Sequence, residues 1–268
     1  MKQTTNLKRF WQLTNILSVV FALGLNFLTG AQLIGLPAIN EISDKYATLL
    51  TPAGYAFSIW SLVYLLLIVF VVYQARDILK PTKDNDLPLK MGPFFAIANI
   101  CNGIWTYIFV QELVALSVVV LLILTTSLFI LLYRLKIAVY DAPLKTIAFT
   151  WWPLLIYTGW VTVATVVNIA SWFKSLGAAI TPLIACIVLV LLALVLVWLL
   201  IKRNVRELLL ASAWGIAAIG VAQLAGNVAI MITAFTVAAV LLIAFMLHGF
   251  KNRATNPFRN LFAKKHSS

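Results

Sequence analysis

The chain has 268 residues, 63% of them hydrophobic and 10% charged, and its mean hydropathy is +1.00. These values exclude an ordinary soluble domain and are typical of a membrane protein with several spanning helices. The formal net charge of +12 comes from basic residues spread through the segments between apolar runs, without a nucleic-acid motif, so we predict no nucleic-acid partner.

Eight apolar segments follow one another along the chain, and each approaches the ~20 residues that a helix needs to cross a bilayer. We expect them at about residues 10–36, 53–74, 91–110, 113–133, 147–171, 180–201, 207–223 and 227–250. Only Gln111 and Glu112 separate the third segment from the fourth, which predicts a tight hairpin. Pro81 and Pro88 indicate a loop over residues 75–90. Small residues that permit close helix packing recur in the seventh segment, at Ala211, Ser212, Gly215, Ala218 and Ala222.

The basic residues alternate between the gaps that separate these segments. Of the 20 Lys and Arg residues, 18 fall in alternate gaps, and only Lys45 and Lys174 fall in the others. By the positive-inside rule, this asymmetry predicts that both termini are cytoplasmic. We therefore expect an all-α fold, a polytopic membrane helical bundle of about eight transmembrane helices, in the plasma membrane (the inner membrane of a bacterium).

Three segments carry aromatic faces. In the fifth segment, Trp160, Ala164 and Asn168 recur every four positions and therefore share one side of a helix. An Asn amide in hydrocarbon needs a hydrogen-bond partner, so this side is expected to face other helices or a ligand. The second and third segments show comparable spacing, i, i+3 and i+7. The candidate ligand-binding residues are Phe57, Trp60, Tyr64, Asn102, Trp105, Phe109, Tyr157, Trp160, Ala164 and Asn168. They predict one cavity for a large, flat, mostly apolar molecule.

Two alternatives stay open at these positions. The indoles of Trp60, Trp105 and Trp160 can pack in the core without lining a pocket, and Asn102 and Asn168 can hydrogen-bond between helices.

All eight Asp and Glu residues fall in loops or at helix ends, which predicts that no carboxylate is buried and argues against an ion-coupled pump. His248 and His266 have no neighbours for a metal site or a catalytic triad, so we predict no catalytic residue, no metal and no required cofactor.

The fifth segment reads W-x-x-x-A-T-x-x-N-x-x-x-W, from Trp160 to Trp172. The third contains N-x-x-W-x-x-x-F, and the second reads T-P-A-G-Y-A-F-S-I-W-S-L-V-Y. In this order the motifs resemble those of the TspO/MBR family, the tryptophan-rich sensory proteins that include the translocator protein. The resemblance covers about residues 10–175 and implies a five-helix membrane domain over 1–175. Residues 176–250 would add three transmembrane helices, and 251–268 a basic cytoplasmic tail.

The resemblance also implies a function. The family's pocket lies inside the five helices, under the loop between the first two, here residues 37–52, and it takes porphyrins, haem-like tetrapyrroles and sterol-sized molecules. Trp60 and Trp160 match positions linked in the family to tetrapyrrole photodegradation, and Ala164 matches a small residue on the sterol-contact face. We therefore expect binding, sensing or carriage of a hydrophobic ligand such as protoporphyrin or haem, with photochemistry secondary.

Two other functions stay open: a transporter or permease component for an uncharged substrate, and a membrane scaffold whose aromatic faces only pack. The expected partners are the lipid bilayer, a hydrophobic small molecule and a second copy of the chain in a homodimer.

Overall fold

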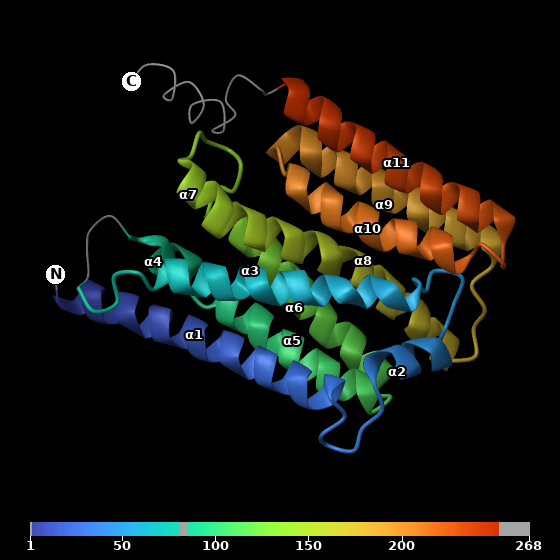
Figure 1. Cartoon of the computed structure of the whole chain (residues 1–268), viewed down its shortest axis with the longest axis horizontal. Coiled ribbons are helices and arrows are strands. Elements are labelled where there is room, and N and C mark those ends of the chain that lie inside the picture. Colours follow the sequence, from blue (N-terminus) through green and yellow to red (C-terminus); the bar gives the residue numbers. More distant parts are fainter. Residues whose placement is uncertain (1, 81–84, 252–268) are drawn as a thin grey trace.

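The computed structural model describes residues 2–80 and 85–251, and within these ranges the regular structure is entirely helical (Figure 1). The long helices are α1 (Lys2–Gly30), α3 (Ile59–Gln74), α5 (Phe94–Val110), α6 (Val114–Arg134), α8 (Trp152–Ser175), α9 (Pro182–Arg203), α10 (Arg206–Ala222) and α11 (Val228–Lys251). Short helical segments connect them: α2 (Ile39–Lys45), a 3-10 turn (Gly54–Ser58), α4 (Leu87–Met91), α7 (Leu144–Thr146) and a π-helical turn (Ile147–Trp151).

These eight long helices coincide with the eight predicted apolar segments. With their helical extensions, six are long and apolar enough to cross a membrane: α1, α3, α6, α8, α9 and α11. The other two, α5 and α10, have 17 residues each. At ~1.5 Å per residue, 17 residues extend about 26 Å, slightly less than a hydrocarbon core of about 30 Å. The fold is therefore a polytopic helical bundle, and the count of eight crossings stays a prediction.

Two predicted boundaries differ from the structure, and a third cannot be compared with it. The first helix ends at Gly30 rather than residue 36, because the chain turns there and Gln32 and Gly35 take positive φ angles of 54° and 69°. In the described part of the loop predicted over 75–90, α4 begins at Leu87, with a proline in its first turn where a missing N–H costs nothing. Of the predicted tail, residues 252–268 lie outside the described ranges, and so does His266.

The π-helical turn before α8 is a further difference. It precedes Pro153, in the first turn of α8. A proline has no N–H to donate to the carbonyl four residues earlier, and its ring crowds that carbonyl. The wider turn accommodates both effects and lets the helical path continue from Leu144 to Ser175.

The bundle has two parts that share α8. On one side α8 packs against α6 and α3, and α1 contacts both α3 and α5; on the other side α8 packs against α10, which contacts α11, and α11 contacts α9 (Figure 1). The later helices are also tied to the loop before α3, since the Ala53 N–H donates to the Ala218 carbonyl at 3.0 Å and the Trp214 indole donates to the Ala56 carbonyl at 3.2 Å.

Small residues bring α8 and α10 close together. A Cβ placed on Gly159 would lie 2.2 Å from the carbonyl oxygen of Leu208 and 3.1 Å from the Cβ of Ala211. The Ser212 hydroxyl donates to the Gly159 carbonyl at 3.0 Å. The predicted close packing of the seventh segment is therefore confirmed at Ala211 and Ser212.

Candidate functional site

The three predicted aromatic faces meet inside the bundle at Trp60. Its ring centroid lies 6.1 Å from that of Trp105 on α5, 6.1 Å from that of Trp160 on α8 and 6.2 Å from that of Tyr157. It stacks on Tyr64 at 5.4 Å. Two further ring pairs extend the group, Phe57 with Trp160 at 6.3 Å and Trp105 with Phe109 at 5.5 Å. We call these seven residues the aromatic cluster: Phe57, Trp60, Tyr64, Trp105, Phe109, Tyr157 and Trp160.

A small cavity of about 30 Å³ lies beside the cluster. Among the candidate residues, its walls include Phe57, Trp105, Phe109, Trp160, Ala164 and Asn168. Trp60, Tyr64, Asn102 and Tyr157 do not line it. A volume of this size holds about one or two water molecules, whereas pockets for drug-sized ligands measure ~300–1,000 Å³. The predicted faces thus converge, but the rings fill most of the space between them.

Both candidate amides find partners on neighbouring helices. The Trp105 indole N–H donates to Asn168 Oδ1 at 2.7 Å, and Asn168 Nδ2 donates to the Ser117 hydroxyl at 2.9 Å. Asn102 Nδ2 donates to the Tyr157 hydroxyl at 2.9 Å and Asn102 accepts from Asn26 at 2.8 Å. These contacts are the interhelical hydrogen bonds that the sequence left open as an alternative role.

Two indoles of the cluster differ from that of Trp105 in the hydrogen bonding of their N–H groups. Trp60 is 7% exposed and Trp160 is 2% exposed, and the buried N–H of each meets no hydrogen-bond acceptor in residues 2–80 and 85–251. Buried donors are nearly always paired, and an unpaired one costs about 1–3 kcal/mol. Sequence periodicity could not reveal these two groups, because it places a side chain on a helix face without indicating what its polar atom meets.

The predicted capping loop contributes to the cavity through Ser43 and Pro52. It is held to the turn between α5 and α6 by Glu112, which pairs with Lys45 at 2.5 Å and accepts from the Tyr46 hydroxyl at 2.7 Å. The hydrogen bonds from Lys45 and Tyr46 hold the pKa of the Glu112 carboxyl below its ordinary value, and the same contact raises the pKa of Lys45. The loop is thus fastened from the surface by an exposed ion pair.

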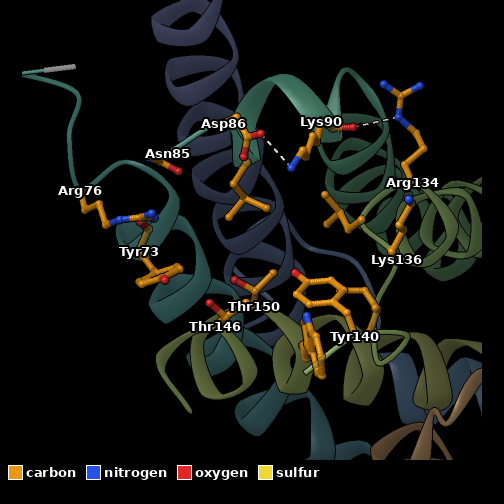
Figure 2. A pocket seen from close by; sticks show the side chains of 14 residues that line it. Tyr73, Arg76, Asn85, Asp86, Lys90, Arg134, Lys136, Tyr140, Thr146 and Thr150 are labelled. Carbon is orange, nitrogen blue, oxygen red and sulfur yellow. Dashed lines mark hydrogen bonds and ion pairs between the residues drawn. The ribbon is translucent and has the colours of Figure 1, made fainter. Parts of the chain in front are cut away.

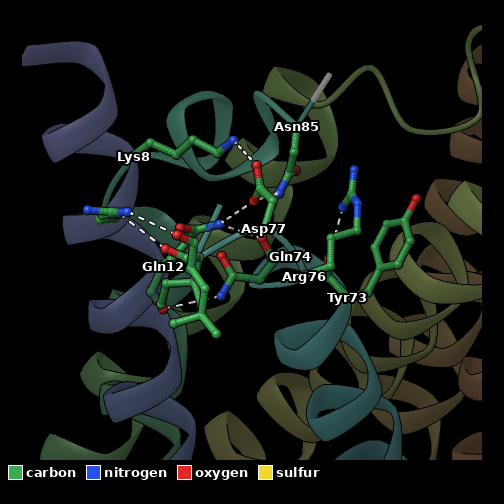
Figure 3. Close-up of polar contacts among 10 residues, drawn as sticks. Lys8, Gln12, Tyr73, Gln74, Arg76, Asp77 and Asn85 are labelled. Atoms are coloured by element: carbon green, nitrogen blue, oxygen red, sulfur yellow. Dashed lines mark hydrogen bonds and ion pairs between the residues drawn. The ribbon is translucent and has the colours of Figure 1, made fainter. Parts of the chain in front are cut away.

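The prediction that no carboxylate is buried was wrong. Asp77 follows α3 in a turn, as expected, but it is only 7% exposed and pairs with Lys8 of α1 (Figure 3). Gln12 and Asn85 donate to its other oxygen at 2.8 Å and 2.6 Å. The turn folds back onto α1, so neighbouring chain replaces water around the carboxylate. Positions 8 and 12 are polar and lie one turn apart on one face of α1, but other polar residues of the first half of that helix surround them, so the sequence signal was weak.

A family model described as TSPO-like protein matches residues 12–247. The match takes in most of the chain and continues past residue 175, through α9 and α10 and into α11. No curated protein and no solved structure matches the chain.

Proposed function

The chain belongs to the TSPO-like family of integral membrane proteins, and we propose that it binds a flat hydrophobic ligand, of the porphyrin or haem type, in the aromatic cluster. The protein would bind the ligand in order to sense it or to carry it. The observation that carries the proposal is that the buried indole N–H groups of Trp60 and Trp160 find no acceptor among the described residues. A ligand that supplies hydrogen-bond acceptors among aromatic rings would satisfy both donors.

The chemistry of a tetrapyrrole matches the cluster. Its ring offers a flat face on which an indole stacks, a contact worth ~0.5–1.5 kcal/mol beyond the area that it buries. Its carboxylates accept hydrogen bonds. Since the cavity measures about 30 Å³, such a ligand requires the rings to separate. We place the entrance for the ligand at the loop that supplies Ser43 and Pro52. An exposed ion pair holds that loop, so the loop can open without movement of a well-packed helix.

The test compares two tryptophans by titrating the purified protein with protoporphyrin and with haem in detergent. Trp160→Leu removes an indole from the cluster, while Trp198→Leu removes one that is 57% exposed on α9. We expect the first change to raise the dissociation constant roughly several-fold and the second to leave it unchanged. Trp160→Phe, which keeps a ring and loses the N–H, separates stacking from hydrogen bonding.

One observation favours a second function. The cluster is tightly packed, which is what a membrane scaffold with purely structural aromatic faces would show. If the parent and all three variants bind both tetrapyrroles equally, or none binds, ligand binding in the cluster is refuted and the scaffold function takes its place.

A further inference from the structure

A second and larger cavity, of about 360 Å³, lies at the end of the bundle where α1 begins and α3 ends. Figure 2 shows Tyr73 and Arg76 on one side of it, Lys90, Arg134 and Lys136 on the other, and Thr146 and Thr150 between them. We call it the basic pocket. It is separate from the aromatic cluster and shares no residue with it.

Charge is the first property of the basic pocket. Among the residues that the structure describes, four lining side chains are basic (Arg76, Lys90, Arg134 and Lys136) and one is acidic (Asp86), a formal excess of three positive charges. Asp86 pairs with Lys90 at 2.7 Å. Close grouping of like charges is unfavourable unless an anion or solvent screens it.

The basic side chains are held in place by the backbone and by rings. Arg134 donates through Nε to the Lys90 carbonyl at 2.8 Å, which leaves the outer nitrogens of its guanidinium for another acceptor. Arg76 lies over the Tyr73 ring at 4.3 Å and donates to the Tyr73 carbonyl at 2.9 Å. Guanidinium groups bind phosphate through several parallel hydrogen bonds, so this positioning suits an oxyanion.

Two buried polar atoms that line the pocket have no hydrogen-bond partner among the described residues. Thr150 is 2% exposed, and its hydroxyl makes no hydrogen bond. Asn85 is also 2% exposed; its amide nitrogen donates to Asp77, but its oxygen is unpaired. Thr150 belongs to the π-helical turn, an irregularity often found at functional sites. The hydroxyl can donate to an anion, and the amide oxygen can accept from a hydroxyl on the same ligand.

We propose that the basic pocket binds a phosphate ester that also carries a hydroxyl group. The guanidinium and ammonium groups and the Thr150 hydroxyl hold the phosphate, and the Asn85 oxygen accepts from the ligand hydroxyl. The volume is sufficient for a small ligand or a phospholipid headgroup. Such a group comes either from a soluble phosphate ester or from an anionic lipid, and basic pockets between membrane helices are known to hold lipid headgroups.

The two sources are distinguished with two probes. Glycerol 3-phosphate is titrated calorimetrically into the protein in phosphatidylcholine nanodiscs, and phosphatidylglycerol retained by the protein is counted by native mass spectrometry. Saturable binding of the soluble probe alone assigns a soluble ester; retention of the lipid, with competition by the soluble probe, assigns a headgroup. Either result supports the site, and failure of both probes to bind the parent protein overturns it.

Matched variants locate the binding. Arg76 and Lys136 are exposed, so Arg76→Gln/Lys136→Gln leaves the buried packing intact and removes, with the charge, the contact of Arg76 with the Tyr73 ring. We expect this double variant to weaken binding by roughly 10-fold or more, and Thr150→Val by about several-fold, since hydrogen bonds to charged groups are the stronger ones. Lys202→Gln/Lys251→Gln removes two exposed charges outside the pocket and should change the affinity less than about twofold, as expected for screened surface charges. Equal losses in the two double variants would mean nonspecific attraction and refute the pocket.

Discussion

Replacement of Gly159 by alanine tests the contact between α8 and α10. The added Cβ would lie 2.2 Å from the Leu208 carbonyl oxygen and 3.0 Å from its carbon. Both are backbone atoms of a helix, so no side chain can rotate to make room. The two helices must separate, and the hydrogen bond from Ser212 to the Gly159 carbonyl, 3.0 Å long, is stretched with them.

The expected loss of stability follows from three contributions. Overpacking a well-packed interior costs about 1–3 kcal/mol. A weakened hydrogen bond adds roughly 1 kcal/mol or less. Alanine is a better helix former than glycine by ~1 kcal/mol, which offsets the second contribution. The net expectation is a destabilisation of about 1–3 kcal/mol.

The measurement is thermal unfolding of purified protein in detergent, with Gly24→Ala as the control. Gly24 lies within α1, and an added Cβ there meets nothing within 4 Å. Its substitution should leave the unfolding temperature unchanged or raise it slightly, while Gly159→Ala lowers it. If Gly159→Ala is as stable as Gly24→Ala, then α8 and α10 do not approach each other as closely as described.

Three further predictions concern the ends of the helices. Reporter fusions at the C-terminus and between α9 and α10 should read cytoplasmic, and a fusion between α8 and α9 external; an external C-terminus would refute eight crossings. Asp77→Asn removes the carboxylate that neutralises buried Lys8 and should destabilise the protein by about 3–5 kcal/mol in thermal unfolding. Asp86→Asn, in an exposed pair, should cost ~0–1 kcal/mol, and equal losses would contradict the burial of Asp77. Because the pKa of Glu112 is lowered in the folded state, its contacts should protect residues 37–52 from protease at neutral pH. Protection should weaken only as the pH falls below the ordinary carboxyl value of ~4.3, and Glu112→Gln should weaken it slightly already at pH ~7, since an exposed pair stabilises only weakly. Equal digestion of parent and variant at neutral pH would show that Glu112 does not fasten the loop.

Several features of this protein follow from the sequence alone. Runs of apolar residues near the length of a membrane span predict the eight helices, because a backbone in hydrocarbon must satisfy its hydrogen bonds within each segment. The i, i+3, i+7 spacing around Trp60 and Trp105, and the four-residue spacing around Trp160, predict that these three residues face inward, because indole and amide groups have no partners in lipid. Both predictions rest on the residue pattern within a single helix. The structure shows these helices, and their aromatic faces contact one another.

Only the tertiary structure decided what the inward faces meet. Asn168 accepts a hydrogen bond from the Trp105 indole, while the donors of Trp60 and Trp160 stay unpaired in the part of the chain that the structure describes. This difference is set by how far each helix is rotated and how closely it approaches its neighbours. The close contact of α8 with α10 at Gly159 and the cavity of about 30 Å³ are distances between helices, which periodicity does not contain. The burial of Asp77 has the same origin, because a turn that looks solvated in sequence becomes interior once another helix covers it.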